Sequence, residues 1–452
     1  MRPRALVFVS ILAMAAVLGV ACSQASTPAP APTTAKSAPP AAAQPTAAAQ
    51  PTAAPVAQPG APVTIRWGIY ADPGRQKVAE AQVAAFQKKY PNIKVNIESA
   101  PFAQYYDKMS AQIVGNTLYD VFMMSGANFQ NFAPKGAFED LTPYIEKAGI
   151  KLDEYTTEKE NSLYQGKVMA VPYELDIQGL FYNKDLFDKA GVKYPDGSWT
   201  WEDLRKAAQK LTITGPDGKA EQWGFYSENL YPSYISFIAQ NGGSVLSEDL
   251  TKCTLNTPEA IQAIQFMVDL IHKDKVSPMP GQLPSGVNPF HTGKVAMRID
   301  GSYSVNPTLA VPFRWDVAPL PQGKKRAAAY WTQAISVFKN SKQKDAAWTF
   351  VQFLLSDEGQ RILAESKFAT PSKKAIANSP AYLTGNPEHI NVFVDAYAYG
   401  RSIQFTPQWF QIMAGGTSVI ARAFDPVWLG QAKVEDAVRN ASAEVDKILA
   451  GR

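Results

Sequence analysis

Strand-like and helix-like segments alternate from Val63 onward, and this order leaves few folds open to the chain. Residues 63–69 carry apolar side chains at every second position, which is the period of a strand. Residues 76–90 carry them at helical spacing, and residues 93–97 alternate again. A second helix around residues 105–114 precedes an apolar strand over 121–124. Such alternation predicts an α/β protein in which helices cover a parallel sheet.

The second half of the chain continues this pattern with helices whose starts are marked in the sequence. Thr200 precedes Trp201-Glu202-Asp203, which combines a capping residue with acidic residues in the first turn. Thr257 precedes Pro258, a residue favoured at the first helical position. We predict helices beginning after Thr200, Thr257 and Ser341, and two α/β lobes in place of one large sheet.

The residues before Val63 have a different character. Arg2 and Arg4 precede a short apolar run that ends at Cys22, so residues 1–21 are predicted to be a signal peptide. The junction resembles a bacterial lipobox, in which the cysteine is acylated; the alternative is an ordinary signal peptide with an incidental cysteine. Residues 23–62 are rich in Pro and Ala and contain no aromatic residue. We therefore predict that residues 22–62 form an acylated, disordered tether, with a span of about 35 Å.

Charge and composition exclude several classes of function. The net charge of +4 falls to +2 once Arg2 and Arg4 leave with the signal peptide, so a nucleic-acid surface is not expected. Only two cysteines and three well-separated histidines occur, which predicts neither a disulfide framework nor a metal site. No glycine-rich nucleotide motif follows a strand, and no cofactor is expected. The hydrophobic content of 46% is typical of a well-packed globular protein.

Short motifs, in order along residues 63 to about 375, resemble one family. They are Phe86-Gln-Lys-Lys-Tyr-Pro91, Asp120-Val121, Ala133-Pro-Lys-Gly136, Leu141-Thr-Pro-Tyr144, Tyr164-Gln-Gly-Lys167, Ala170-Val-Pro172, Phe181-Tyr-Asn-Lys-Asp-Leu186, Trp199-Thr-Trp-Glu-Asp-Leu204, Phe290-His-Thr-Gly-Lys-Val-Ala-Met297, Asp300-Gly301, a helix ending at Leu355-Ser-Asp-Glu-Gly-Gln360, and Pro371. The chain is similar to the extracellular solute-binding proteins of ABC importers, in particular the carbohydrate-binding family that includes maltose-binding protein.

This resemblance implies the two-lobed periplasmic-binding-protein fold, in which each lobe is a sheet flanked by helices and crossing hinge strands join the lobes. The chain would cross near residues 176–179, return near 330–333 and cross again near 371–375. The N-terminal lobe would then comprise residues 63–175 plus about 332–373. The C-terminal lobe would comprise residues 176–331 plus about 374–452.

A sugar site needs flat aromatic surfaces and groups that exchange hydrogen bonds with hydroxyls. The resemblance implies a cleft carboxylate at Asp176, and Glu174 would share its face in an extended strand. Asn128 follows a strand at an edge where open α/β sheets hold ligands. The aromatic candidates are Tyr303, Trp331, Tyr70, Tyr226, Tyr231 and Trp409. Core packing is the alternative role for each aromatic, and a hinge or salt-bridge role is the alternative for Asp176.

We therefore expect an extracytoplasmic binding protein, anchored to the cell membrane through lipid on Cys22. It would act as a monomer, capture a sugar or related polyol without chemistry, and deliver it to ABC permease subunits. One alternative is a secreted glycoside hydrolase using Glu174 and Asp176, whose backbone positions would lie about 7 Å apart. Another is a sensory binding protein for a membrane receptor. An anionic ligand such as a sugar phosphate would require cations, for which Arg298 and Arg401 are available.

Overall fold

The computed structural model describes residues 62–156, 162–227, 231–283, 288–414 and 416–451. The predicted signal peptide, Cys22 and the Pro/Ala-rich segment lie outside these residues, as does Gly415. The described residues all belong to one compact unit, which spans Gln58–Arg452. Within them, no helix combines the length and the apolar character that crossing a membrane requires.

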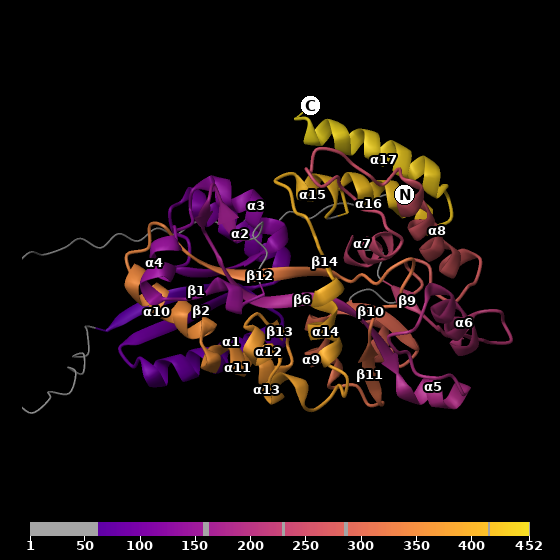
Figure 1. Ribbon diagram of the computed structural model, residues 1–452, viewed down its shortest axis with the longest axis horizontal. Coiled ribbons are helices and arrows are strands. Elements are labelled where there is room, and N and C mark those ends of the chain that lie inside the picture. Colours follow the sequence, from indigo (N-terminus) through magenta and orange to yellow (C-terminus); the bar gives the residue numbers. More distant parts are fainter. Residues whose placement is uncertain (1–61, 157–161, 228–230, 284–287, 415, 452) are drawn as a thin grey trace, which may run out of the picture. The chain divides into compact units, whose positions relative to one another are not determined.

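The first part of the chain forms the predicted parallel arrangement. Strand β1 (Val63–Tyr70) lies between β2 (Ile93–Ala100) and β3 (Val121–Ser125), and it pairs with both in parallel. Helices α1 (Pro73–Lys89) and α2 (Phe102–Val114) form the crossovers (Figure 1). Helix α1 starts three residues earlier than the apolar pattern indicates, because Asp72 caps it and Pro73 occupies its first turn.

Three strands run side by side through the centre of the fold. Strand β6 (Val171–Asn183) is buried along all 13 of its residues, and β12 (Ala329–Val337) and β13 (Thr370–Pro371) each pair with it in antiparallel orientation. Strand β12 also pairs with β3. The sheet therefore continues from β2, β1 and β3 through β12 and β6 to β10 (Met297–Gly301) and β9 (Tyr226–Ser227).

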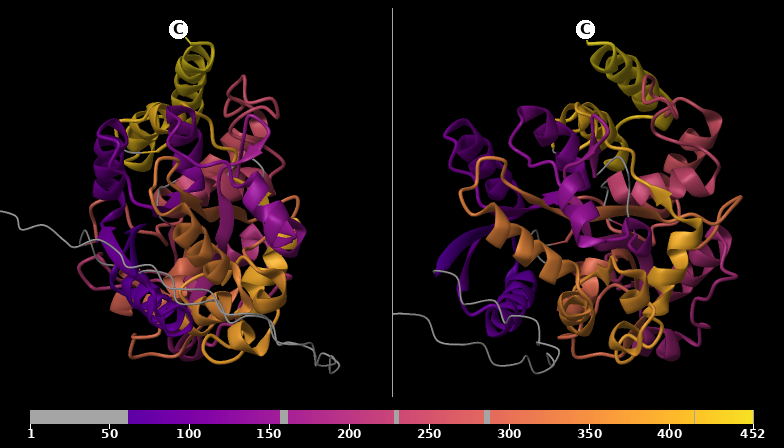
Figure 2. Two further views of the ribbon diagram at one scale, coloured as in Figure 1. Left: turned by 90° about the vertical axis from the view of Figure 1, so that its left-hand side faces the viewer. Right: turned by 60° about the vertical axis from the view of Figure 1, so that its left-hand side comes forward.

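Shorter elements complete the layers around this sheet. The remaining strands are β4 (Leu163–Tyr164), β5 (Lys167–Val168), β7 (Ile213–Thr214), β8 (Ala220–Gln222), β11 (Trp315–Ala318) and β14 (Arg401–Ser402). The remaining α-helices are α3 (Gly126–Phe132), α4 (Thr142–Ala148), α5 (Lys184–Ala190), α6 (Trp201–Leu211), α7 (Tyr231–Gln240), α8 (Pro258–His272), α9 (Val305–Thr308), α10 (Lys344–Leu355), α11 (Asp357–Ser366), α12 (Lys374–Ala377), α13 (Pro380–Leu383), α14 (Asn391–Asp395), α15 (Trp409–Ile412), α16 (Val419–Trp428) and α17 (Val434–Leu449). Helices α1 and α17 lie on opposite sides of the described fold in both views of Figure 2.

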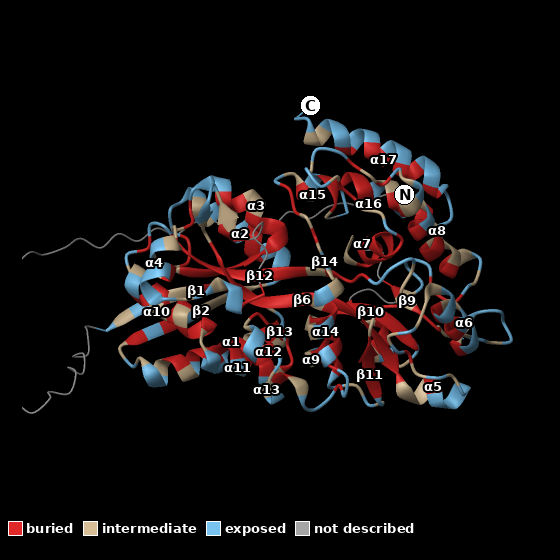
Figure 3. Cartoon of the chain, in the orientation of Figure 1, coloured by how far each residue is buried: buried red, intermediate tan, exposed pale blue. Residues whose placement is uncertain are grey.

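The buried apolar residues form two separate clusters. The first core draws mainly on residues 65–173 and 334–369, and the second core draws mainly on residues 177–329 and 376–445. The change from one to the other falls within β6 and within β12. Figure 3 shows both strands buried across the middle of the fold, with exposed faces on outer helices such as α17. Two cores joined by shared strands are what the predicted two-lobed fold requires.

Two of the three predicted helix starts are confirmed. Thr200 caps α6 in a complete capping box with Asp203, and Thr257 caps α8. Ser341 is not the cap of α10, because the helix begins at Lys344 with Gln343 in the cap position; the Ser341 hydroxyl accepts from the Gln343 backbone N–H at 3.0 Å and donates to Asp120 Oδ1 at 2.5 Å. Helix α10 ends at Leu355, and Ser356 then caps a separate helix, α11, so the segment through Gln360 is two helices where we expected one.

Candidate ligand-binding site

A cavity of about 460 Å³ lies at the junction of the two cores. Six aromatic side chains line it: Tyr70, Phe102, Tyr231, Tyr303, Trp331 and Phe368. The polar lining comes from Asp72, Arg75, Ser125, Asp176 and Gln333. Tyr70 and Phe368 belong to the first core, whereas Trp331 belongs to the second. A ligand in this cavity would therefore touch both halves of the fold.

The centre of the cavity is built by the pairing of β6 with β12. Asp176 lies opposite Trp331, and Gln333 lies opposite Glu174. Gln333 Nε2 donates a hydrogen bond to Asp176 Oδ2 at 2.7 Å, and Gln333 Oε1 accepts one from the Tyr70 hydroxyl. This chain of hydrogen bonds connects the two lobes at the cavity and fixes the orientation of the Asp176 carboxylate.

Asp176 has the electrostatic properties of a binding group. Only 2% of the residue is exposed, and within the described part of the chain its Oδ1 has no hydrogen-bond partner. Burial raises the pKa of Asp176 to about 7, and the neighbouring Glu174 charge acts in the same direction. The hydrogen bond from Gln333 and the charge of Arg75 oppose this effect only partly. A ligand that donates a hydrogen bond to Oδ1 would satisfy a group that the protein leaves unpaired.

Arg75 supplies the positive charge beneath the cavity. The capped start of α1 places it in the first helical turn, where its Nη2 forms a 2.6 Å ion pair with Glu174 Oε1. The guanidinium also lies over the rings of Tyr70 and Phe368, at 5.0 and 4.6 Å from their centroids. Glu174 itself is fully buried. These contacts hold Arg75 in place and leave Glu174 as its direct counter-ion.

Five of the nine predicted site residues line the cavity: Asp176, Tyr303, Trp331, Tyr70 and Tyr231. Glu174 lies just behind it through Arg75. Trp409 packs edge-on against Tyr231 with ring centroids 5.3 Å apart, and it borders a separate hollow of about 30 Å³. Tyr226 lies beneath the Arg298 guanidinium, 5.7 Å from its ring centroid.

Asn128 occupies a different setting from the one expected. It lies in helix α3, where the sequence suggested a loop, and its Nδ2 donates to Ser125 Oγ at 3.0 Å. Since Ser125 lines the cavity, Asn128 is one residue removed from it. A strand-end position was therefore a correct guide to the region, but the immediate start of a helix directed the Asn128 side chain to a neighbouring residue.

Sequence reasoning missed Arg75, Phe102, Gln333 and Phe368, all of which line the cavity. The sequence did contain a signal for the position of Arg75, because Asp72-Pro73 marks a helix start directly after a strand of the parallel sheet. Gln333 lies at the end of the predicted return crossing. The contribution of Phe368 depends on its long-range packing with Arg75, for which the local sequence gives no indication.

The two arginines considered for an anionic ligand are elsewhere. Arg298 forms a 2.7 Å ion pair with Asp300 and is 5% exposed. Arg401 borders the small hollow beside Trp409. Within the described residues, the cavity lining therefore contains one cationic side chain, Arg75, which is already paired with Glu174.

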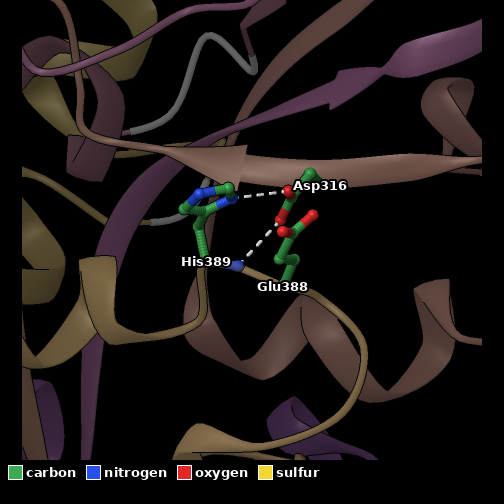
Figure 4. A group of neighbouring side chains, drawn as sticks. All are labelled: Asp316, Glu388 and His389. Atoms are coloured by element: carbon green, nitrogen blue, oxygen red, sulfur yellow. Dashed lines mark hydrogen bonds and ion pairs between the residues drawn. The ribbon is translucent and has the colours of Figure 1, made fainter.

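A second cluster of ionisable groups lies near β11. The carboxylates of Asp316 and Glu388 and the imidazole of His389 have donor atoms within 4.8 Å of one another (Figure 4). Asp316 Oδ2 is 2.7 Å from His389 Nδ1, and its Oδ1 accepts from the His389 backbone N–H. Lys184 Nζ lies 4.0 Å from Asp316 and 3.5 Å from Glu388. The lysine and histidine thus already supply the cationic and hydrogen-bonding partners that the buried Asp316 requires.

Comparisons with known proteins agree on one family. Residues 70–361 match the model of the bacterial extracellular solute-binding proteins. An arabinooligosaccharide-binding protein of Bacillus subtilis is 30% identical over 302 residues, covering 62% of this chain and 67% of the relative. A maltooligosaccharide ABC transporter solute-binding lipoprotein of Streptococcus pneumoniae is 25% identical, covering 72% and 76%.

Solved structures show the same fold. An ABC substrate-binding protein from Listeria monocytogenes in complex with cycloalternan superposes with a TM-score of 0.78 at 30% identity, covering 86% of this chain and 99% of that one. A maltose-bound MalE3 from T. maritima gives a TM-score of 0.74 at 25% identity, covering 85% and 100%.

Proposed function

Because this chain belongs to the bacterial extracellular solute-binding proteins, we propose that it captures a carbohydrate between its two lobes and delivers it to the permease of an ABC transporter. The observation that carries this proposal is the cavity at the junction of the two cores, where Asp176 and Trp331 lie side by side. A carboxylate beside an aromatic ring matches the hydroxyl edge and the apolar face of a sugar. The oligosaccharide specificities of its relatives support the same ligand class.

The proposed protein binds its ligand without reacting with it. A glycosidase needs two carboxyl groups that both reach the sugar. Glu174 is fully buried and bonded to Arg75, so of the two predicted acids only Asp176 lines the cavity. The other lining carboxylate, Asp72, is engaged as the cap of α1, where its Oδ1 accepts from the Gly74 and Arg75 backbone N–H groups. The relatives are binding proteins as well. Turnover of any bound sugar by the purified protein would overturn this part of the proposal.

The lobes and the anchor are proposed as the sequence indicated. We place the N-terminal lobe at residues 63–175 plus about 332–373, and the C-terminal lobe at residues 176–331 plus about 374–452. Lipid on Cys22 would hold the monomer at the outer face of the membrane, and the description of the relative from Streptococcus pneumoniae as a lipoprotein supports such an anchor. Cys22→Ser should then move the protein from the membrane fraction to the soluble fraction, and an unchanged distribution would contradict the anchor.

A thermal-shift screen of residues 63–452 against sugars and polyols tests the ligand class. A ligand at 100 times its Kd should add about 2.7 kcal/mol to the free energy of unfolding. Asp176→Ala and Trp331→Ala should abolish the shift. Trp348→Ala is the matched control, since Trp348 has the same 8% exposure as Trp331 but lies on α10 outside the cavity lining. Absence of any shift across the screen would remove the carbohydrate assignment.

Delivery to a permease is separated from sensing by a second assay. The liganded protein should stimulate ATP hydrolysis by its cognate transporter reconstituted in vesicles. A protein that instead activates a membrane receptor, and leaves every co-expressed permease without stimulation, would fit the sensory alternative.

A further inference from the structure

The charges around the cavity are unbalanced. Asp72, Arg75 and Asp176 line it, and Glu174 lies behind Arg75. Asp72 is partly neutralised by the start of α1, where it accepts hydrogen bonds from two backbone N–H groups. The single guanidinium is bonded to Glu174 Oε1 at 2.6 Å. Among the described groups, Asp176 is therefore a buried carboxyl that lacks an ion-pair partner of its own.

Among the residues that the structure describes, two buried oxygens on β6 have no hydrogen-bond partner. They are Glu174 Oε2 and Asp176 Oδ1. The two residues are two positions apart on β6, so their side chains lie on the same face of the strand. Each oxygen accepts hydrogen bonds and cannot donate one when ionised. Since Glu174 lies behind the cavity lining, Asp176 Oδ1 is the oxygen of the pair that a ligand in the cavity can reach. When ionised it requires a donor, and a positively charged donor satisfies it most strongly.

The aromatic lining favours the same kind of ligand. The rings of Tyr303 and Trp331 lie with centroids 6.3 Å apart beside Asp176, and Tyr231 contributes a further ring. Aromatic faces attract ammonium groups as well as the apolar faces of sugars, and the attraction is strongest where water is excluded. An anionic ligand would meet Asp176 and Asp72 with no unpaired arginine or lysine in the described lining.

We propose that the cavity selects saccharides by charge, binding those that carry a protonated amine more tightly than their neutral or acidic counterparts, with Asp176 as the counter-ion. This inference rests on the proposed carbohydrate-binding function and adds the charge class of the ligand to it. The ammonium group would donate to Asp176 Oδ1 and lie against the Trp331 and Tyr303 rings, while the sugar ring would occupy the rest of the aromatic lining.

Binding of such a ligand is coupled to the ionisation of Asp176. Its charge interacts with those of Glu174 and Arg75, and in addition to burial it raises the pKa of Tyr70, Tyr231 and Tyr382. Burial and Glu174 raise its pKa to about 7, so below that pH the free site is mainly protonated. An incoming cation stabilises the carboxylate and lowers this pKa, so a proton is released on binding. A neutral sugar carries no charge that could lower the pKa of Asp176 in this way.

The test compares sugars in which one substituent is exchanged for a charged one. Calorimetry at pH 7.0 would measure glucose, glucosamine and glucuronate, then cellobiose, its diglucosamine analogue and cellobiuronate, and then maltose with 4′-amino-4′-deoxymaltose. In the pairs that bind, the amine should bind about tenfold more tightly than the neutral sugar, and the acids should bind more weakly. At pH 6.0, titrations in two buffers of different ionisation enthalpy should show up to one proton released per bound amine.

Variants assign the effect to Asp176. Asp176→Asn should reduce the amine-to-neutral affinity ratio to about 1 and remove the proton release. Asp425→Asn removes the same charge from an exposed position on α16 and should leave both unchanged. Amines that bind no better than neutral sugars, or an amine preference that survives in Asp176→Asn, would overturn the inference. Neutral sugars that bind without an amine preference leave the proposed function standing, whereas no binding by any saccharide rejects both.

Discussion

At the scale of single residues, Arg75 is the group on which the polar centre of the cavity depends. Its partner Glu174 is fully buried, so Arg75→Met would leave a carboxylate uncompensated. Breaking a buried ion pair from one side costs about 3–5 kcal/mol. We expect a loss of that size in the free energy of unfolding, measured by urea denaturation, and we expect the double variant Arg75→Met/Glu174→Leu to recover most of it.

A surface pair provides the control for this prediction. Arg439 and Asp436 lie 2.6 Å apart on α17 with exposed side chains, and Arg439→Met should change the free energy of unfolding by less than about 1 kcal/mol. If Arg75→Met and Arg439→Met lowered the free energy of unfolding equally, burial would not determine the strength of the Arg75–Glu174 pair.

The raised pKa of Asp176 also predicts how stability depends on pH. Because the folded pKa of about 7 exceeds the ordinary value of 3.8, the folded protein binds more protons than the unfolded chain between these pH values. The contribution of Asp176 to stability is therefore present at low pH and is lost as the pH rises toward 7. The stability of Asp176→Asn relative to the wild type should increase from pH 4.5 to 7.5, by at most about 1.4 kcal/mol per pH unit.

Asp249 is the control for this prediction, because its pKa is lowered where that of Asp176 is raised. Hydrogen bonds from Ser247 and Thr251 lower its pKa to about 2, so its contribution is lost only at more acidic pH. The stability difference between Asp249→Asn and the wild type should therefore stay constant between pH 4.5 and 7.5. A flat profile for Asp176→Asn over the same range would contradict the raised pKa.

How far single residues could be predicted depended on the range of their contacts. Asp176 and Trp331 were found because both lie on the crossing strands that the family resemblance implied. The positions of Arg75 and Gln333 had sequence signals, but their partners did not: Glu174 is 99 residues from Arg75, and Tyr70 is 263 residues from Gln333. No local pattern encodes such pairings; they become visible only once the sheet order is known.

At the scale of elements, the caps that the sequence marks can be tested separately. Thr200 Oγ1 accepts a hydrogen bond from the Asp203 backbone N–H, and the Asp203 carboxylate accepts one from the Thr200 backbone N–H. Thr200→Ala should destabilise the protein by about 1 kcal/mol in urea denaturation, and Thr200→Asn should restore most of that loss. A Thr200→Asn variant as unstable as Thr200→Ala would mean that the hydroxyl acts through something other than the cap.

Elements were predicted well where hydrophobic periodicity determined them. The strands β1, β2 and β3 and the helices α1 and α2 follow apolar spacing, and each occurs within a few residues of its expected bounds. The start of α10 was predicted too early. Ser341 has a side chain typical of a cap, but it accepts from the Gln343 backbone N–H in the turn before the helix, which begins at Lys344. The residue type alone does not show whether such a bond belongs to a turn or to the first turn of a helix.

At the scale of the whole molecule, the crossing strands explain how one chain builds two cores. Strand β6 is shared by both, and β12 and β13 pair with the half of β6 nearer the first core. Periodicity predicted α/β lobes, but which segments cross between them came only from the family resemblance. The reason is physical: a crossing strand and an ordinary buried strand have the same apolar pattern.

Such shared strands predict a hinge whose angle the ligand controls. A ligand in the cavity touches residues of both cores, so it stabilises the closed arrangement more than the open one and shifts the population toward closure. Small-angle X-ray scattering of residues 63–452 should show a smaller radius of gyration at saturating concentrations of a sugar that raises the melting temperature. Trp331→Ala at the same sugar concentration should keep the unliganded value, and Trp348→Ala should contract like the wild type. Calorimetry in parallel would show whether the site is fully occupied. If the radius of gyration of the wild type stays constant at full occupancy, the shared strands form a rigid connection. The permease must then recognise the bound protein by something other than lobe closure.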